Sequence, residues 1–380
     1  MASDDTVLRS DPLADPIMEI GFGVFKASLV CQAIELGIFD KIEVLNKKVT
    51  AVGFANNYGY KPEVTERILD ALVCYGLLNK SNSQDEPEYS NSKTVQKYLL
   101  KSDQPCLNST LLGIRLLSQF VDKLDTVIKQ GSNNTVYERL LDGSEDGRDF
   151  TNSKLERQEI KTDQNQNPVA ERKKTNKTDS SAHSFMVQMD SLLRPAVHAI
   201  TVAFDVAGHK TLLDLGGNSG YLAFEFIKTY PQLKAIVLDR PHTIQLAKKY
   251  QPAHTKSKVE FIEGDFFDNK KFPEVDLMML SHIIHNWDED KLDILLTKTY
   301  QSLKPGGTLL VAEKLLNEDK IGPEITILLD VTMTTVCNGR ERTLSEYQKL
   351  LGRYGFQNIE GKRIAGVNYF DVIIARKPDI

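Results

Sequence analysis

The sequence predicts an α/β protein, in which a doubly wound, mostly parallel sheet follows a smaller helical domain. Residues 1–143 carry apolar side chains at mainly helical spacing. Residues 144–182 are polar and charged, and they hold too few apolar side chains to offset the entropy of ordering, so they are expected to be a disordered insert. From residue 183 to residue 380, strand-like apolar runs alternate with helical segments, which is typical of a doubly wound sheet.

The N-terminal domain is expected to open with a helix within residues 20–42. Thr50 suits the N-cap of a second, short helix, and Pro62 suits the first turn of a third. Residues 77–92 follow as two short strands around a polar tip. Helices followed by a hairpin predict a winged-helix-like domain.

Two functions compete for this domain, DNA binding and dimerisation. The helix that begins at Pro62 carries three acidic residues, Glu63, Glu66 and Asp70, and one basic residue, Arg67. Such a helix is poorly suited to contacts with the phosphate backbone of DNA. We therefore expect a packing or dimerisation module, and the charge disfavours a transcription factor.

The composition excludes further classes of function. A net charge of -5 over 380 residues offers no basic surface for nucleic acid or an anionic membrane. The four cysteines have neither metal-ligand spacing nor a disulfide pattern. The first residues lack the apolar region of a signal peptide, and no uninterrupted apolar run is long enough to cross a bilayer. A cytoplasmic protein without a metal is expected.

The C-terminal part contains the alternating strands and helices. The expected strands are residues 211–217, 234–239, 259–265, 275–281, 307–313 and 370–377. The expected helices are residues 221–230, 243–250, 289–303, 323–337 and 343–355. Thr343 and Glu346 form a capping box at the start of the last helix. Ligands of such a sheet bind at the carboxyl ends of its strands, so the site is expected there.

The first of these strands runs into a glycine-rich loop, DLGGNSG, at residues 214–220. Its glycines, Gly216, Gly217 and Gly220, let the backbone turn sharply and approach a ligand closely. A dinucleotide-binding loop begins directly with glycine and follows G-x-G-x-x-G, whereas here Asp214 precedes the glycines and the spacing differs. The loop therefore favours S-adenosylmethionine over a dinucleotide.

Acidic residues also end the next two strands. Asp239 is expected to accept both ribose hydroxyls of the cofactor, and Asp265 with Phe266 to hold the adenine amine and ring. Any one of these acids has an alternative interpretation as a helix N-cap or a loop carboxylate. Acids at three successive strand ends make a cofactor site the better interpretation.

The run SHIIHNWDED, residues 281–290, ends the fourth strand and holds two histidines and the only tryptophan. A catalytic base, a metal site and an ordinary strand end are the alternatives. A metal would use His282 and His285 on one helical turn, but Asp288 is the only further ligand nearby in the sequence. The metal interpretation is therefore disfavoured.

Seven motifs occur in the order and at the spacing of a known family: LLDLGGNSG, VLDRP, EGDFF, IIHNWDED, LKPGG, VAEKLL and GRERT. Through them the sequence resembles the cation-independent, S-adenosylmethionine-dependent O-methyltransferases, and most closely their acetylserotonin O-methyltransferase-like branch. The resemblance covers nearly all of the C-terminal part and, more weakly, the N-terminal part. It implies a Rossmann-like methyltransferase sheet, an N-terminal dimerisation domain, S-adenosylmethionine as cofactor with S-adenosylhomocysteine as product, and no metal.

The resemblance also implies a catalytic group. His285 matches the catalytic histidine of the family, and Glu313 and Glu341 match the two acids that orient and charge its ring. A phenol has a pKa of about 10 and histidine one of about 6.5. A histidine is therefore a reasonable base if carboxylates in contact with the ring stabilise the imidazolium that forms.

Further positions follow from the same resemblance. Those expected at the cofactor are Phe185, Met189, Ser281 and His282. Those expected at the methyl acceptor are Asn286, Thr332, Met333 and Val336. Phe185 and Met189 have an equally ordinary interpretation as core residues at helical spacing.

The sequence departs from the family at several positions. Asn218 stands where glycine is usual, and asparagine tolerates the left-handed backbone conformation that such a loop needs. Asn286 stands where the family has aspartate, so the missing charge is expected to affect the choice of acceptor. Thr332 and Val336 stand where acetylserotonin-type enzymes carry an amide pair, which weakens a specific acetylserotonin assignment.

The sequence thus predicts an O-methyltransferase that methylates a hydroxyl of a small aromatic acceptor, phenolic or indolic and N-acetylserotonin-like. A catalytically degenerate homologue that binds the cofactor and has a regulatory function is the alternative. The presence of His285, Glu313 and Glu341 speaks against that alternative. An NAD-dependent dehydrogenase is disfavoured by the spacing of the glycine-rich loop.

Overall fold

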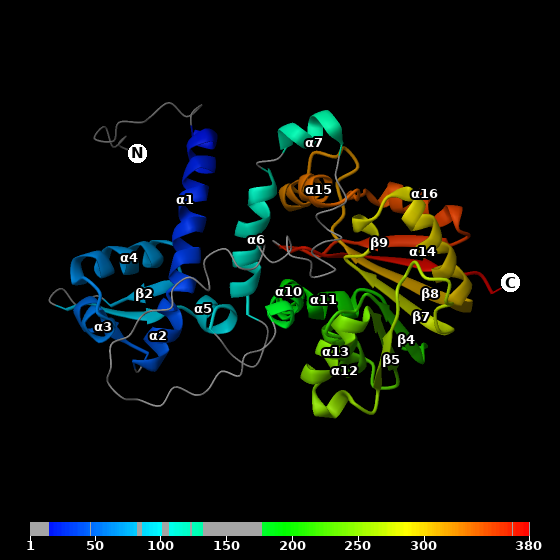
Figure 1. The fold of residues 1–380 in the computed structure, drawn as a ribbon, viewed down its shortest axis with the longest axis horizontal. Coiled ribbons are helices and arrows are strands. Elements are labelled where there is room, and N and C mark those ends of the chain that lie inside the picture. The colour runs from blue at the N-terminus through cyan, green and yellow to red at the C-terminus, as the bar shows by residue number, and fades with distance from the viewer. Residues whose placement is uncertain are drawn as a thin grey trace, which may run out of the picture. The chain divides into compact units, whose positions relative to one another are not determined.

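The computed structural model describes residues 15–45, 47–81, 86–100, 106–121, 124–131, 177–366 and 368–379. The chain divides into two compact units, Met1–Arg115 and Leu116–Ile380 (Figure 1). Most of the predicted insert lies outside the described residues, and its last part, residues 177–182, forms the beginning of a helix.

The N-terminal unit combines helices with a small antiparallel sheet. Its helices are α1 (Asp15–Glu35), α2 (Ile38–Val44), α3 (Ala51–Tyr58), α4 (Pro62–Cys74) and α5 (Lys93–Tyr98), and α6 (Asn108–Val121) continues into the second unit. Its strands are β1 (Val49–Thr50), β2 (Leu78–Lys80) and β3 (Glu88–Asn91), in the order β1-β3-β2. Thr50 caps α3 by accepting a hydrogen bond from the Gly53 N–H at 3.1 Å, and Pro62 begins α4. The hairpin of β2 and β3 was predicted, whereas β1 was not.

Helix α1 is apolar, and it is exposed over residues 15–28. The side chains of Ile17 and Phe25 are both 73% exposed. Within the described part of the chain, α1 is the one helix that is long and apolar enough, by length and composition, to cross a membrane. Its apolar run is not uninterrupted, because Glu19 and Lys26 lie within it, but these two charged residues do not make the helix polar.

The second unit contains a seven-stranded sheet in the order β6-β5-β4-β7-β8-β10-β9. Its strands are β4 (Thr211–Leu215), β5 (Lys234–Asp239), β6 (Val259–Glu263), β7 (Val275–Ser281), β8 (Leu303–Glu313), β9 (Gln357–Lys362) and β10 (Asp371–Arg376). Strands β4 to β8 pair in parallel, and β10 is antiparallel to both β8 and β9. The predicted doubly wound, mostly parallel sheet is confirmed. The edge strand β9 was missed because its sequence, QNIEGK, is polar and has no apolar alternation.

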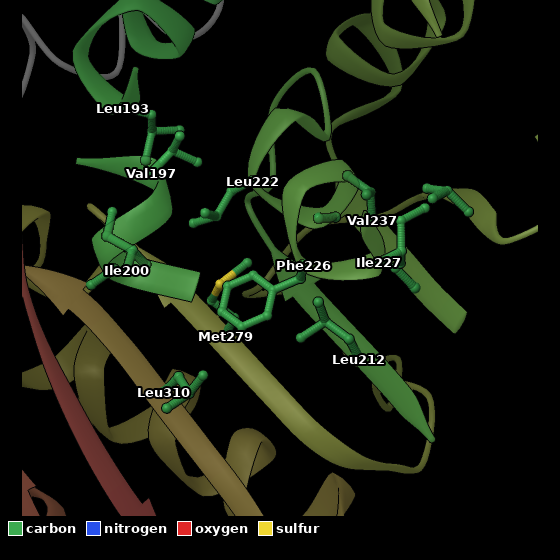
Figure 2. Packing of buried hydrophobic residues seen from close by; sticks show 14 of the residues in the cluster. Leu193, Val197, Ile200, Leu212, Leu222, Phe226, Ile227, Val237, Met279 and Leu310 are labelled. Carbon is green, nitrogen blue, oxygen red and sulfur yellow. The ribbon is translucent and has the colours of Figure 1, made fainter. Parts of the chain in front are cut away.

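Helices cover both faces of this sheet. The helices of this unit are α7 (Leu124–Gln130), α10 (Lys177–Leu193), α11 (Val197–Val202), α12 (Tyr221–Thr229), α13 (Pro241–Tyr250), α14 (Glu289–Ser302), α15 (Glu324–Val336) and α16 (Leu344–Arg353), with the 3-10 turns η1 (Ala253–Thr255) and η2 (Ile284–Asn286). Neighbouring strand residues point to opposite faces, so Leu212 packs with α10 to α13 and Leu213 packs with α14 and α16. In Figure 2, Phe226 of α12 packs with Leu212, Met279 and Leu310 of three strands.

Candidate active site

The candidate site lies at the carboxyl ends of β4, β5, β7 and β8. In the sheet order, β5 lies on one side of β4 and β7 on the other, so the direction of the winding reverses at β4. Loops that leave neighbouring strands in opposite directions open a crevice at this position, where doubly wound folds bind their ligands. Asp239 and Glu313 end β5 and β8, Asp214 lies near the end of β4, and His285 follows β7.

The loop after β4 has the backbone conformation that its glycines allow. Gly216 and Gly220 have φ angles of +70° and +83°, in the left-handed region that favours glycine. Asn218 has a φ of +53°, so it adopts the left-handed conformation at the position where the family carries glycine. A Cβ atom on Gly217 would lie 2.5 Å from Oδ2 of Asp214. The loop backbone therefore closes tightly over this carboxylate.

Asp214 is a buried carboxylate that lacks hydrogen-bond partners within the described part of the chain and has a raised pKa. It is 1% exposed, and neither side-chain oxygen has a hydrogen-bond partner among the described residues. Burial, and then the charge of Asp239, raise the pKa of Asp214 to about 8. Buried polar groups normally have partners, and a cationic group such as the α-ammonium of S-adenosylmethionine suits this one. The loop thus fits the predicted cofactor.

Asp239 ends β5 beside this loop. Its carboxylate accepts hydrogen bonds from the backbone N–H groups of Asn218 at 3.0 Å and Arg240 at 2.7 Å. Burial raises the pKa of Asp239, and these two donors oppose the rise. A carboxylate has about four acceptor positions, so Asp239 retains capacity for hydroxyl donors.

The loop after β6 holds the third predicted acid. Asp265 is exposed, and its Oδ1 accepts the N–H two residues further on at 2.8 Å, which makes it a turn residue in this structure. The Phe266 ring lies 3.0 Å from where a Cβ atom on Gly216 would be. Lys298 of α14 donates to the carbonyls of Phe266 and Asp268 at 2.7 and 2.9 Å. No local sequence pattern marks this lysine, which holds the loop in place.

Helix α10 is joined to the glycine-rich loop by polar contacts that no local sequence pattern predicts. Ser219 Oγ donates to Asp190 Oδ1 at 2.7 Å, and Asn218 Nδ2 donates to the Met186 carbonyl at 3.2 Å. The partners lie 29 and 32 residues apart in sequence, beyond the range of local patterns. The predicted residues of this helix are neighbours of these contacts: Phe185, which is 38% exposed, and Met189, which is half-buried.

Strand β7 ends at Ser281, and the chain then turns sharply into η2. His282 has a φ of +53°, and its carbonyl accepts a hydrogen bond from Asn286 Nδ2 at 2.8 Å. The His282 Nε2–H donates to the Tyr369 carbonyl at 3.2 Å. Burial and the neighbouring His285 hold the pKa of His282 well below its ordinary value. Asn286 therefore uses its amide to close the turn, a contact that a carboxylate does not make.

His285 and Glu341 form a buried pair. The distance between His285 Nδ1 and Glu341 Oε1 is 2.7 Å, and the side chains are 4% and 0% exposed. Burial alone would lower the pKa of His285, but the charges of Glu341 and Glu313 outweigh it and raise this pKa to about 9. Burial raises the pKa of Glu341, against the effect of His285. An Nδ1–H that faces a carboxylate leaves Nε2 as the basic nitrogen of the neutral ring.

Glu313 ends β8 and contacts the backbone of the turn, not the imidazole ring. Its Oε1 accepts hydrogen bonds from the N–H groups of Ile283, Ile284 and His285 at 2.9, 2.7 and 3.3 Å. Its Oε2 accepts a hydrogen bond from the Tyr347 hydroxyl. Glu341 therefore contacts the ring directly, whereas Glu313 acts on it through its charge, which raises the pKa of His285, and through the backbone of the turn.

The loop that carries Glu341 approaches η2 closely. A Cβ atom on Gly339 would overlap the carbonyl of His285, so glycine is required there. Asp330 of α15 accepts a hydrogen bond from the Glu341 N–H at 2.8 Å, which joins this loop to the helix of the predicted acceptor residues. Those residues are Thr332 and Met333, which are half-buried, and Val336, which is buried.

A metal site has no support in this arrangement. The rings of His282 and His285 lie edge to face with centroids 4.7 Å apart. Over the ranges that the structure describes, no group of three or more His, Cys, Asp and Glu residues is arranged to hold a metal ion.

The fold and the cofactor loop together define an S-adenosylmethionine-dependent methyltransferase. The family model of the O-methyltransferase domain matches residues 168–357, and that of the O-methyltransferase dimerisation domain matches residues 18–101. The chain belongs to the S-adenosylmethionine-dependent O-methyltransferases. The predicted family, fold class, type of enzyme and cofactor are confirmed.

Individual relatives agree with this assignment. Acetylserotonin O-methyltransferase of Bos taurus is 28% identical over 361 residues, which cover 95% of this chain and 97% of that protein. The Gallus gallus enzyme of the same name is 29% identical over 365 residues, 95% of this chain and 96% of the relative. The crystal structure of human N-acetylserotonin methyltransferase in complex with SAM has a TM-score of 0.80 at 26% identity and covers 100% of both chains.

Proposed function

We propose that this enzyme transfers the methyl group of S-adenosylmethionine to the hydroxyl of a small aromatic acceptor, phenolic or indolic and N-acetylserotonin-like. The observation that carries the proposal is the buried pair of His285 and Glu341, with 2.7 Å between Nδ1 and Oε1. The names of the bovine and chicken relatives, at 28% and 29% identity, support this acceptor class.

His285 is the proposed general base. Its Nδ1–H donates to Glu341, so Nε2 takes the proton of the acceptor hydroxyl as the oxygen attacks the methyl carbon. Glu341 then faces an imidazolium and stabilises its charge in a buried environment. A base with a pKa of about 9 is well matched to a phenolic proton, whose ordinary pKa is about 10. Glu313 contributes by holding the turn that carries the ring.

The loop after β4 and the ends of the neighbouring strands are proposed to hold the cofactor, which supplies an electrophilic methyl group on a sulfonium when bound. Asp214 would face its cationic end, and Asp239 its ribose hydroxyls. Gly216, Gly217 and Gly220 let the backbone approach it. The other proposed neighbours are Asp265, Phe266, Ser281, His282, Phe185 and Met189.

Acceptor choice is proposed to depend on α15 and η2. Thr332, Met333 and Val336 are the side chains of α15 assigned to the acceptor, and Asn286 is the one from η2. Asn286 donates to the His282 carbonyl, so it contributes shape to this site and no charge.

A pair of histidine variants tests the base. His285→Ala should retain the affinity for S-adenosylmethionine within about twofold and lose at least roughly 100-fold in transfer, because proton transfer by a positioned base contributes 10²–10⁴-fold. His254→Ala, at an exposed histidine in η1, is the control and should leave both unchanged. The assays are calorimetric cofactor binding and transfer from labelled cofactor to a panel of phenols and indoles.

Two results would contradict the proposal. Unchanged turnover in His285→Ala would remove the base assignment. Cofactor binding by the wild-type protein without transfer to any phenol or indole would remove the acceptor class.

A homodimer through the N-terminal unit is also proposed. Its support is the match of residues 18–101 to the dimerisation domain, together with the exposed apolar surface of α1. A second copy that covers α1 would remove Ile17 and Phe25 from water. Phe25→Glu should therefore yield monomers in light scattering after gel filtration, whereas Ile294→Glu, on α14, should remain dimeric. A dimeric Phe25→Glu variant would argue against α1 as the interface.

A further inference from the structure

Tyr347 is a buried tyrosine that no motif in the sequence singles out. It is 0% exposed, and its hydroxyl donates to Oε2 of Glu313. Burial and the charge of Glu313 raise its pKa well above the ordinary value, so the hydroxyl keeps its proton and remains a donor. The one side chain that contacts Glu313 by a hydrogen bond within the described residues is therefore a neutral phenol.

Glu313 depends on such neutral donors. Besides the Tyr347 hydroxyl, its partners are three backbone N–H groups, those of Ile283, Ile284 and His285. All three donate to Oε1. In the part of the chain that the structure describes, Glu313 makes no ion pair with a basic side chain. A buried carboxylate that makes no hydrogen bond to a basic side chain is costly unless its acceptor positions are used by other donors. Removing the donor on Oε2 should therefore leave the carboxylate poorly restrained.

The hydroxyl of Tyr347 comes from a rigid element. Helix α16 begins with the capping box of Thr343 and Glu346, so its first turn is fixed. Leu350 and Leu351 lie on the same buried face of α16 as Tyr347 and pack in the core beneath β7 and β8. The position of the hydroxyl is thus set by the fold, independently of the turn that carries His285.

We propose that Tyr347 is a positioning residue for His285: its hydroxyl holds the Glu313 carboxylate against the backbone of η2, so that the imidazole keeps its alignment with Glu341. This inference rests on the proposed role of His285 as base. The chain of contacts runs from α16 through one carboxylate to three backbone N–H groups.

Tyr347→Phe isolates the hydroxyl because phenylalanine preserves the ring in the core. Tyr354→Phe is the matched control, since Tyr354 follows the same helix and its hydroxyl donates to a carboxylate, that of Asp293, at 3.2 Å. Tyr347→Phe is expected to lower kcat about tenfold and to change the KM for cofactor less than twofold, as a hydrogen bond to a charged group is lost. The control should keep both constants.

The single tryptophan provides a readout besides turnover. Trp287 directly follows η2, and its ring lies edge to face with Phe267 at a centroid distance of 4.8 Å. Loosening of the turn should increase quenching of Trp287 fluorescence by acrylamide in Tyr347→Phe and leave it unchanged in Tyr354→Phe. A merely structural loss would lower the melting temperature without this local change at assay temperature.

A double-mutant cycle with Glu313→Gln tests whether Tyr347 acts through Glu313. If it does, kcat of the double variant should equal that of Glu313→Gln alone, whereas independent roles would multiply the two losses. If Tyr347→Phe does not fold, Glu313→Gln alone tests the same link by kcat and Trp287 quenching, and wild-type values would overturn the inference.

The two proposals fail in different ways. Full turnover in His285→Ala refutes the base assignment, and with it the reason for positioning. A severe loss in His285→Ala together with wild-type kcat and quenching in Tyr347→Phe leaves the base intact and overturns the positioning role alone.

Discussion

Replacing Glu341 by glutamine should lower both the pKa of His285 and the rate of methyl transfer. Glutamine keeps the size of Glu341 and can still accept a hydrogen bond from Nδ1 of His285, which lies 2.7 Å from Oε1. The substitution removes the negative charge from a pair whose side chains are 4% and 0% exposed. It therefore separates the effect of charge from that of shape.

The magnitude follows from the pKa of His285. Burial lowers this pKa, and the charges of Glu341 and Glu313, in that order of size, raise it to about 9. Without the larger charge, the pKa should fall toward the ordinary value of about 6.5, a change worth up to roughly 3 kcal/mol. Because the base must be neutral, wild-type activity should rise with pH up to about 9 and then level off.

Two measurements follow the change. Histidine ring resonances of the cofactor-free protein report the pKa directly, and His285→Ala assigns the signal among the seven histidines. The pH profile of kcat/KM at saturating cofactor should show its ascending limb at lower pH in Glu341→Gln, with a plateau roughly 100-fold below that of the wild type. The two enzymes should therefore have similar rates near pH 7, and the advantage of the wild type should grow as the pH rises from 7 to 9.

Glu360→Gln, at an exposed acid in β9, is the control for charge and should titrate like the wild type. A His285 resonance that still titrates near 9 in Glu341→Gln would refute the reasoning, because Glu341 would then not be the source of the raised pKa. A lower rate of methyl transfer in Glu341→Gln, with the ascending limb of the pH profile at the same pH as in the wild type, would refute the reasoning as well.

The other predictions concern the backbone around the site. Gly339→Ala should destabilise the protein by about 1–3 kcal/mol and lower kcat, since its Cβ atom overlaps the carbonyl of His285; urea unfolding and turnover check this. Asn286→Asp should cost about 1–3 kcal/mol of stability, because a carboxylate cannot donate to the His282 carbonyl, and an unchanged unfolding midpoint would contradict it. Lys298→Met should weaken S-adenosylmethionine binding in calorimetry with a smaller effect on kcat, because it frees the loop after β6; unchanged affinity would contradict the loop's role.

The predictable part of the site lies in local patterns. The glycine-rich loop was recognisable because steric freedom at Gly216 and Gly220 is a property of single residues, and both adopt left-handed conformations. His285 and Glu341 were predicted as a pair through motif resemblance, and they lie in contact although 56 residues separate them. Their catalytic roles stay predictions until the variants are measured.

Other contacts had no local signal. Glu313 was predicted at the imidazole, but its hydrogen bonds go to the backbone of η2. Its partner Tyr347 lies 34 residues away on α16, where a buried tyrosine looks like any core residue in the sequence. The requirement for Gly339 arises only where two loops meet.

The sequence by itself determined the fold class, the family and the cofactor, because alternating apolar runs and a glycine-rich loop after a strand reflect the physics of neighbouring residues. Only the tertiary structure decided which carboxylate meets the ring of His285 and which meets its backbone. It also decided that Asn286 closes a turn by binding a carbonyl. Such choices depend on where distant strand ends converge and on which buried donors still need an acceptor there.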